Sequence, residues 1–136
     1  MKIFWDTNLF IYLVEKTPDL HDRAVKLRQE MLLHGDVLAT STLTLAELLV
    51  QPLRQGNHEL VNLYKKIFCS PRLILLSLDI KVAEQVAEIR ARHQVRTPDA
   101  IQLASASIFE TDRFYTSDRS LWGKRIHGIR EILGLE

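Results

Sequence analysis

Apolar residues along the chain follow two alternating patterns. Short apolar runs of three or four residues are typical of strands buried on both faces, and we expect such strands at 3–5, 37–39, 73–76 and 114–116. Between these runs, apolar residues return every three or four positions, which predicts helices packed on one side. The tail 125–133 is expected to add a short fifth strand and a final turn.

Capping and turn residues set the expected helix boundaries. Helices are expected from 8 to 15, from 18 to a stop at Gly35, from 42 to near Pro52, from 57 through Ile67, from 79 through Arg90 and from 97 through Ile108. Thr97 is expected to cap the last helix, with Pro98 in its first position. In the helix from 57, the residues expected to face inward are Leu60, Leu63, Tyr64 and Ile67.

Strands that alternate with helices predict an α/β fold, in which helices cover both faces of a parallel sheet. A length of 136 residues suggests one domain, residues 1–136. The single cysteine, Cys69, excludes an internal disulfide and is expected to be a small buried residue at a helix end.

Composition narrows the class of protein only a little. The chain is 46% apolar and 26% charged, with a formal net charge of +1, as in an ordinary soluble protein. This net charge does not by itself indicate a nucleic-acid partner, although local patches matter more than the sum. No apolar run reaches the length of a membrane span and nothing indicates secretion, so we expect a cytoplasmic protein.

Four acidic residues lie where an expected strand ends or an expected helix begins: Asp6, Glu47, Asp99 and Asp118. In an open parallel sheet, ligands bind beyond the carboxyl ends of the strands. Asp6 and Asp118 follow strands, whereas Glu47 and Asp99 occupy early turns of helices that start at the same edge. Topology therefore places all four acids on one side of the sheet. Whether they meet depends on strand order, which the spacing does not give.

A cluster of carboxylates needs a counter-ion, because like charges repel and buried charges lose hydration. Such oxygen ligands suit one or two Mg²⁺ or Mn²⁺ ions, which keep several waters that can supply a nucleophile. No cluster of His and Cys residues supports a structural zinc site. Thr7, Asn8 and Ser117 lie beside the acids and can support the ligands, while Thr7 and Asn8 also suit a helix start.

With these segments in order, the chain resembles PIN-domain ribonucleases, and among them the VapC-type toxins of toxin–antitoxin pairs. The segments that carry the resemblance are Asp6-Thr7-Asn8 after the first strand, 41–48 around Glu47, 96–104 around Asp99, and 115–118 ending in Asp118. The resemblance covers essentially the whole chain.

The resemblance implies an α/β/α sandwich with parallel strands in the order 3-2-1-4-5, which puts Asp6 and Asp118 on neighbouring strands. It implies hydrolysis of RNA phosphodiester bonds that depends on Mg²⁺ or Mn²⁺. Asp6, Glu47, Asp99 and Asp118 would be the catalytic metal ligands, with Asp118 acting directly or through a water. It also implies a homodimer and a small antitoxin protein as a partner.

Four basic residues lie shortly before Asp99: Arg90, Arg92, His93 and Arg96. Arg96 and Arg92 are candidates to hold an RNA backbone near the metals. The alternative is a solvated helix face, because cations are favourable near a helix C-terminus. Lys124 and Arg125 are expected to be surface charges, and His127 is expected to be structural.

Two other functions stay open at this point. A catalytically silent PIN-like module would bind RNA or a protein without cleaving it. A phosphoaspartate-type signalling or phosphatase domain would usually need a second acid close to Asp6 and a Lys after a late strand. Here Thr7 and Asn8 follow Asp6, and no expected strand precedes Lys124.

Overall fold

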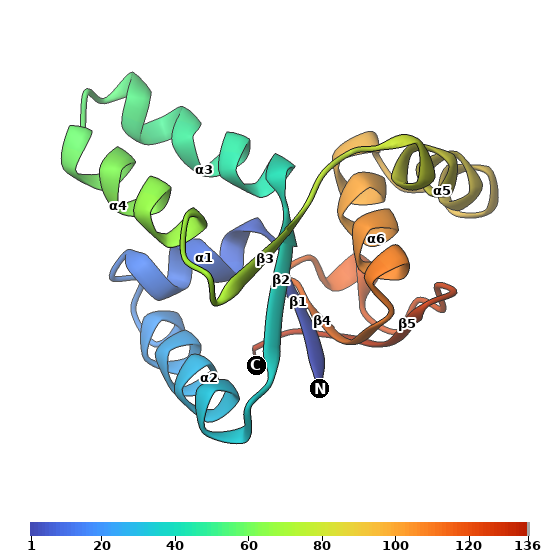
Figure 1. The fold of residues 1–136 in the computed structure, drawn as a ribbon, viewed down its shortest axis with the longest axis horizontal. Helices are drawn as coiled ribbons and strands as arrows, with labels where there is room; N and C mark the ends of the chain where they lie inside the picture. Colours follow the sequence, from blue (N-terminus) through green and yellow to red (C-terminus); the bar gives the residue numbers. More distant parts are fainter. Residues whose placement is uncertain (136) are drawn as a thin grey trace.

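The structure is a computed structural model that describes residues 1–135, and its helices lie on both sides of one sheet (Figure 1). The elements, in chain order, are β1 (Lys2–Trp5), α1 (Thr7–Val14), α2 (Leu20–His34), β2 (Val37–Ser41), α3 (Thr42–Arg54), α4 (His58–Phe68), β3 (Leu73–Leu76), α5 (Ile80–Arg92), α6 (Thr97–Phe109), β4 (Thr111–Tyr115), the 3-10 helix η1 (Arg119–Leu121) and β5 (Ile129–Leu133).

The five strands form one sheet in the order β3-β2-β1-β4-β5, and every neighbouring pair is parallel. This confirms the predicted fold class and strand order. β1 occupies the centre, where Phe4 lies opposite Ala39 of β2 and Phe114 of β4. The carboxyl ends of β1 and β4 are therefore direct neighbours, so the residues that follow them, Asp6 and Asp118, leave the sheet at the same edge.

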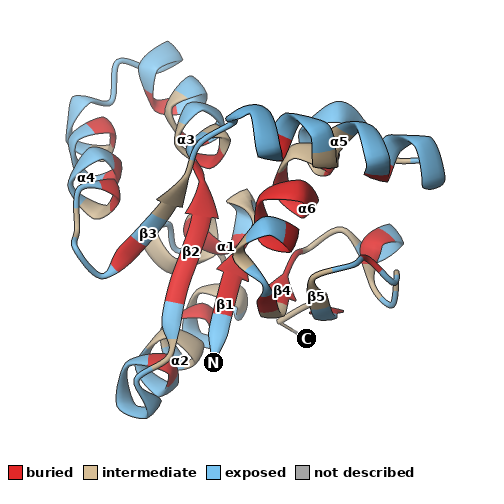
Figure 2. Cartoon of the chain, turned by 45° about the vertical axis from the view of Figure 1, so that its right-hand side comes forward, coloured by how far each residue is buried: buried red, intermediate tan, exposed pale blue. Residues whose placement is uncertain are grey.

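Alternation of side chains along β1 gives the molecule two cores, one on each face of the sheet. Ile3 and Trp5 pack with apolar residues of α1, α2, α3 and α4, whereas Phe4 packs with residues of α5 and α6. Phe4 also stacks on Phe114, with ring centroids 5.2 Å apart. In Figure 1 the two groups of helices lie on opposite sides of the strands, and in Figure 2 the central strands and α6 are largely buried.

The helix α6 is buried along most of its length, as its composition predicts. Its small Ala and Ser side chains let its backbone lie close to the sheet, and it contacts both β2 and β4. Thr111 at the start of β4 donates a hydrogen bond of 2.7 Å to the carbonyl of Ala106, which fastens the end of the helix to the strand that follows. The first turn of α6, which carries Asp99, is thereby placed at the carboxyl edge.

Two helix ends differ from the sequence prediction. α3 continues through the buried Pro52 to Arg54, because the last turn is still closed by a bond from the Gln55 amide to the Gln51 carbonyl. Arg96 rather than Thr97 is the capping residue of α6, so Pro98 lies one position further into the first turn.

Two burial predictions for α4 are wrong. Val61, Tyr64 and Phe68 form its buried face, whereas Leu63 is 43% exposed. Successive helical residues are about 100° apart, so a helix that buries Tyr64 turns Leu63 away. Cys69 is exposed, because it follows the last helical residue where the chain turns toward β3.

The predicted tail is confirmed in its second half only. β5 covers Ile129–Leu133, residues 123–128 form the loop that precedes it, and residues 134 and 135 continue without a turn.

Candidate active site

The four acidic residues lie around one cavity of about 220 Å³ at the carboxyl edge of the sheet. Each comes from a different segment: Asp6 follows β1, Glu47 lies in α3, Asp99 lies in the first turn of α6, and Asp118 precedes η1. The remaining lining residues are Thr7, Asn8, Arg96, Pro98, Gln102 and Ser117. The structure thus brings together all four acids and the three polar neighbours that the sequence singled out.

Asp6 is fixed by hydrogen bonds to both of its carboxylate oxygens. The Thr7 amide donates to Oδ1 at 2.7 Å, which starts α1, and the Thr116 hydroxyl donates to Oδ2 at 2.9 Å. The Asp6 amide in turn donates to the Tyr115 carbonyl at 3.0 Å. The position of this carboxylate therefore depends on the pairing of β1 with β4.

Glu47 is connected to the interior through Thr7. The Thr7 hydroxyl donates to Oε1 of Glu47 at 2.6 Å, so this threonine supports an acid as well as beginning a helix. The side-chain amide of the buried Gln102 donates a hydrogen bond of 2.8 Å to the Thr44 hydroxyl and a longer one of 3.5 Å to the Thr7 hydroxyl. The Gln102 carbonyl accepts from Ser41 at 2.8 Å, which fixes the orientation of the amide group. This buried network links the starts of α1, α3 and α6.

Asp118 and Asn8 are held by neighbouring hydroxyl groups. Oδ1 of Asp118 accepts from the amide and from the hydroxyl of Ser120, at 3.0 and 2.7 Å. The Asn8 side-chain amide donates to the Ser117 hydroxyl at 2.5 Å. Asn8 and Ser117 thus bind each other across the ends of β1 and β4, beside the acids of the cavity.

Arg96 is the one cation among the residues that line the acid cavity. Its guanidinium lies 3.8 Å from the Asp99 carboxylate, and its side chain is 85% exposed. Arg92, the other candidate for RNA contact, does not line this cavity. Arg92 forms an ion pair of 3.2 Å with Glu88 on α5, and both side chains are largely exposed.

The electrostatics of the cavity show an excess of negative charge. Burial raises the pKa of Asp6 to about 6, against hydrogen bonds from Thr7 and Thr116 that lower it, and the charges of Asp99 and Glu47 raise it further. Burial also raises the pKa of Asp99, where Arg96 acts in the opposite direction and Asp118 and Glu47 add to the increase. Carboxylates that raise each other's pKa would be stabilised by a cation between them.

The donor chemistry of the cavity fits a hard divalent cation. Its ligand groups are carboxylate, hydroxyl and amide oxygens, and no thiol or imidazole lines it. Within residues 1–135, no three acidic, histidine or cysteine side chains already converge on one point closely enough to hold an ion. Mg²⁺ typically uses only one or two carboxylates and keeps several waters, so four acids around the cavity offer enough protein ligands.

Three site residues escaped the sequence analysis: Thr116, Gln102 and Thr44. Gln102 had a detectable signal, because an uncharged polar residue in an otherwise small and apolar helix needs buried hydrogen-bond partners. Thr116 and Thr44 gave no such signal, because threonine is ordinary in a strand and near a helix start.

Comparison with known families identifies the class of protein that this fold and cavity represent. The PIN domain family model matches residues 3–122, which contain all four acids. The chain therefore belongs to the PIN domain family. Comparison with curated protein sequences gave no match.

Solved structures of PIN proteins share the fold over nearly the whole chain. VapBC2 from Rickettsia felis, bound to a promoter DNA fragment, aligns with a TM-score of 0.74 and 23% identity over 98% of this chain and 97% of that chain. The Mycobacterium tuberculosis toxin VapC20, described as cleaving the sarcin–ricin loop, gives 0.69 and 21% over 85% and 89%. A toxin–antitoxin complex from Klebsiella pneumoniae gives 0.66 and 19% over 93% and 94%.

Proposed function

We propose that this protein is a metal-dependent endoribonuclease that hydrolyses RNA phosphodiester bonds and acts as the toxin of a toxin–antitoxin pair. The observation that carries the proposal is the convergence of Asp6, Glu47, Asp99 and Asp118 on one cavity. Membership of the PIN family and the likeness to toxin structures, one of them an RNA-cleaving toxin, support it.

The four carboxylates would hold one or two Mg²⁺ ions, with Mn²⁺ as an alternative. A bound divalent cation supplies an activated water and stabilises charge on the phosphoryl oxygens. The chain's own groups have separate roles. The Thr116 hydroxyl and the Thr7 amide hold Asp6 in one orientation, and the Thr7 hydroxyl holds Glu47. The exposed Arg96 guanidinium, 3.8 Å from the Asp99 carboxylate, would bind a phosphate of the substrate.

The first test replaces Asp6. Asp6→Asn keeps the size of the side chain and an acceptor for the Thr7 amide, but removes the charge. Cleavage of a structured RNA in the presence of Mg²⁺ is expected to fall by more than about 100-fold, because loss even of a supporting partner of a metal ligand costs ~10–100-fold. Product formation is measured on a denaturing gel, and a chelator should abolish cleavage by the unchanged protein.

The matched control is Asp22→Asn, which neutralises an exposed acid of α2 outside the cavity. Its cleavage rate should stay near that of the unchanged protein. Normal cleavage by a folded Asp6→Asn protein would contradict the assignment. Binding of Mn²⁺ measured by titration calorimetry separates the enzyme from a silent module, since a degenerate site would bind no ion.

We further propose an antitoxin protein as a partner, a homodimeric state and a cytoplasmic location. The solved neighbours include toxin–antitoxin complexes. The helices α3 and α4 expose Val50, Leu53 and Leu63, which offer apolar surface for such contacts. Within the described part of the chain, no helix combines the length and the apolar character needed to cross a bilayer. A short antitoxin gene beside this one would support the toxin role.

A further inference from the structure

Two segments of the chain are basic and contain no acidic residue. Residues 90–98 carry three arginines, and residues 119–130 carry three arginines and one lysine. Together these 21 residues hold seven of the 18 Lys and Arg residues and none of the 17 Asp and Glu residues. The net charge of +1 therefore hides a separation of charge, with all of the acids in the rest of the chain.

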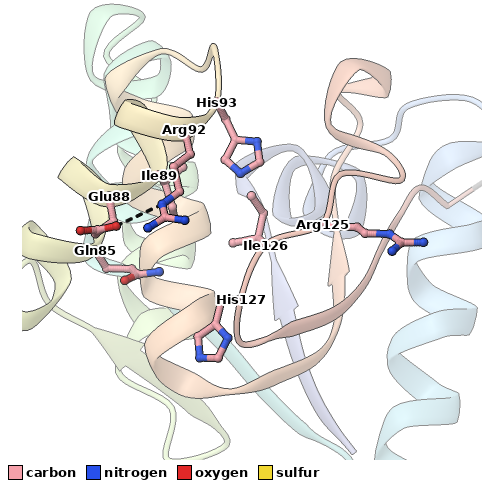
Figure 3. Close-up of a pocket in the computed structure, with 8 residues that line it drawn as sticks. All are labelled: Gln85, Glu88, Ile89, Arg92, His93, Arg125, Ile126 and His127. Atoms are coloured by element: carbon pink, nitrogen blue, oxygen red, sulfur yellow. Dashed lines mark hydrogen bonds and ion pairs between the residues drawn. The ribbon is translucent and has the colours of Figure 1, made fainter.

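The fold places these two segments on opposite walls of one cleft. The cleft has a volume of about 810 Å³ and lies between the end of α5 and the loop 123–128 (Figure 3). Arg92 and His93 come from one wall and Arg125 and His127 from the other, with the Arg125 guanidinium directed away from Arg92 (Figure 3). No sequence pattern connects the two walls, since Arg92 and Arg125 are separated by 32 intervening residues.

The walls of the cleft are anchored to the core. Ile89 and Ile126, which line it, are 3% and 5% exposed and belong to the core between the sheet and α5 and α6. The His127 carbonyl accepts a hydrogen bond from the Ser107 hydroxyl of α6, and that hydroxyl also accepts from Gln85 of α5 at 3.2 Å. The cleft is therefore part of the folded scaffold.

The charges that face the cleft favour an anion. Arg125 is exposed and has no hydrogen-bond or carboxylate partner among residues 1–135. Among residues 1–135, Glu88 is the only acid that lines the cleft, and it is paired with Arg92 at 3.2 Å. His93 and His127 each add at least one ring N–H donor. Arginine binds phosphate through two parallel hydrogen bonds, which suits a phosphodiester backbone better than a point charge does.

Both segments adjoin acids of the cavity in the sequence, although the cleft and the acid cavity are lined by different residues. The segment 90–98 ends beside Asp99, and its Arg96 lines that cavity, while the segment 119–130 begins directly after Asp118. The four carboxylates repel the phosphate groups of a polyanion bound at the acid cavity. Cations near the flanking phosphates would offset this repulsion.

We propose that the cleft between α5 and the loop 123–128 binds the sugar–phosphate backbone of single-stranded RNA next to the bond that is cleaved. The proposal rests on the proposed function for the identity of the polyanion. Arg92 and Arg125 bind phosphates from opposite walls, and Glu88 weakens the contact by occupying Arg92. Arg125, which is an exposed surface charge as predicted, and His127 would both belong to this binding surface.

Binding is tested apart from cleavage. The Asp6→Asn protein in a chelating buffer is titrated into a fluorescein-labelled single-stranded RNA of about 16 nucleotides, and fluorescence anisotropy gives Kd at several salt concentrations. Arg92→Gln and Arg125→Gln should each weaken RNA binding about fivefold at about 0.1 M salt, and the double variant should weaken it about 25-fold. The reason is that each lost phosphate contact removes about 0.7 from the slope of log K against log salt.

Two further variants make the test specific. Glu88→Gln should tighten binding, since it removes the one acid that residues 1–135 contribute to the cleft and frees Arg92. Arg54→Gln makes the same charge change at the exposed end of α3, on the opposite face of the sheet, and should leave Kd within about twofold.

The proposal would be overturned if RNA affinity fell equally in Arg92→Gln, Arg125→Gln and Arg54→Gln. It would also be overturned if the folded protein bound no RNA. Binding that depends on Arg92 and Arg125 while the unchanged protein cleaves no RNA would support the cleft and reject the nuclease. Binding only of an acidic peptide, with no RNA affinity, would assign the cleft to a protein partner and overturn the proposal.

Discussion

Asp6 combines two properties that conflict in a folded protein: it is enclosed by other groups and it lies among negative charges. Burial first, and then Asp99 and Glu47, raise its pKa from 3.8 to about 6. An acid with a higher pKa in the folded state binds its proton more tightly there. Its ionisation therefore lowers stability progressively as the pH rises from about 4 to about 6, and the full cost is present above that range.

In buffer without divalent cations, Asp6→Asn should increase the free energy of unfolding at neutral pH and above. A pKa of about 6 against 3.8 corresponds to about 3 kcal/mol as an upper bound, and the gain should vanish near pH 4. Urea unfolding at several pH values measures it. Asp22→Asn should change the free energy by less than about 0.5 kcal/mol throughout. A gain for Asp6→Asn that does not vary with pH would have a cause other than ionisation.

The four acids show how far individual residues could be predicted. Each is flanked by apolar or turn residues at a strand end or helix start, so the sequence places them at one edge, and the strand order then brings Asp6 beside Asp118. The groups that orient them were harder to find. Thr116 and Asp6 are 110 positions apart in the sequence, and no local sequence pattern predicts a hydrogen bond between residues so far apart.

At the scale of elements, the loop 123–128 is fixed by one close approach of its backbone to α6. Gly128 has φ of +84°, and a Cβ placed on it would lie 2.5 Å from the Ser107 carbonyl oxygen. Its own carbonyl accepts from the Thr111 amide at 2.9 Å, at the start of β4. Glycine is required here by both backbone conformation and space.

Gly128→Ala should therefore lower the free energy of unfolding by roughly 2–4 kcal/mol, because strain from positive φ adds to a contact with backbone that cannot move aside. Gly123→Ala is the matched control in the same loop. Gly123 has φ of +77° but nothing within 4 Å of the added Cβ, so its cost should be only about 1 kcal/mol. Chemical denaturation gives both values, and equal costs would show that the approach to Ser107 is not decisive.

Elements were predicted well where one physical rule dominates and less well where two compete. Asp79 caps α5 through a bond of 2.9 Å from the Val82 amide, and Gly35 ends α2 in the left-handed conformation, as expected. α3 was expected to end near Pro52 and continues two residues further, to Arg54, with Pro52 buried inside the helix. The position of β5 depends on pairing with β4, which only the folded sheet determines.

At the scale of the whole molecule, the two cores share the strands of one sheet, with β1 at its centre. Trp5 lies in the core beneath α1–α4, whereas Trp122 packs against the core beneath α5 and α6. Since neighbouring residues of β1 contribute to opposite cores, loss of packing on one side should destabilise both.

Phe4→Ala removes an aromatic ring from the α5–α6 side and should lower the free energy of unfolding by about 3–5 kcal/mol. In a Trp122→Phe background, the fluorescence of Trp5 reports the opposite core. Its urea transition should shift together with the far-UV circular dichroism transition. A Trp5 signal that stays at its original midpoint while the dichroism shifts would show that the two cores unfold separately.

The position of β1 between β2 and β4 also has a consequence for the order in which the chain is made. β1 can pair with β2 as soon as residue 41 is available, but both carboxylate oxygens of Asp6 are satisfied only when Thr116 is present as well. During synthesis from the N-terminus, the acid cavity therefore cannot assemble until the chain has emerged past Asp118. A growing polypeptide that ends before residue 118 therefore lacks a complete acid cavity.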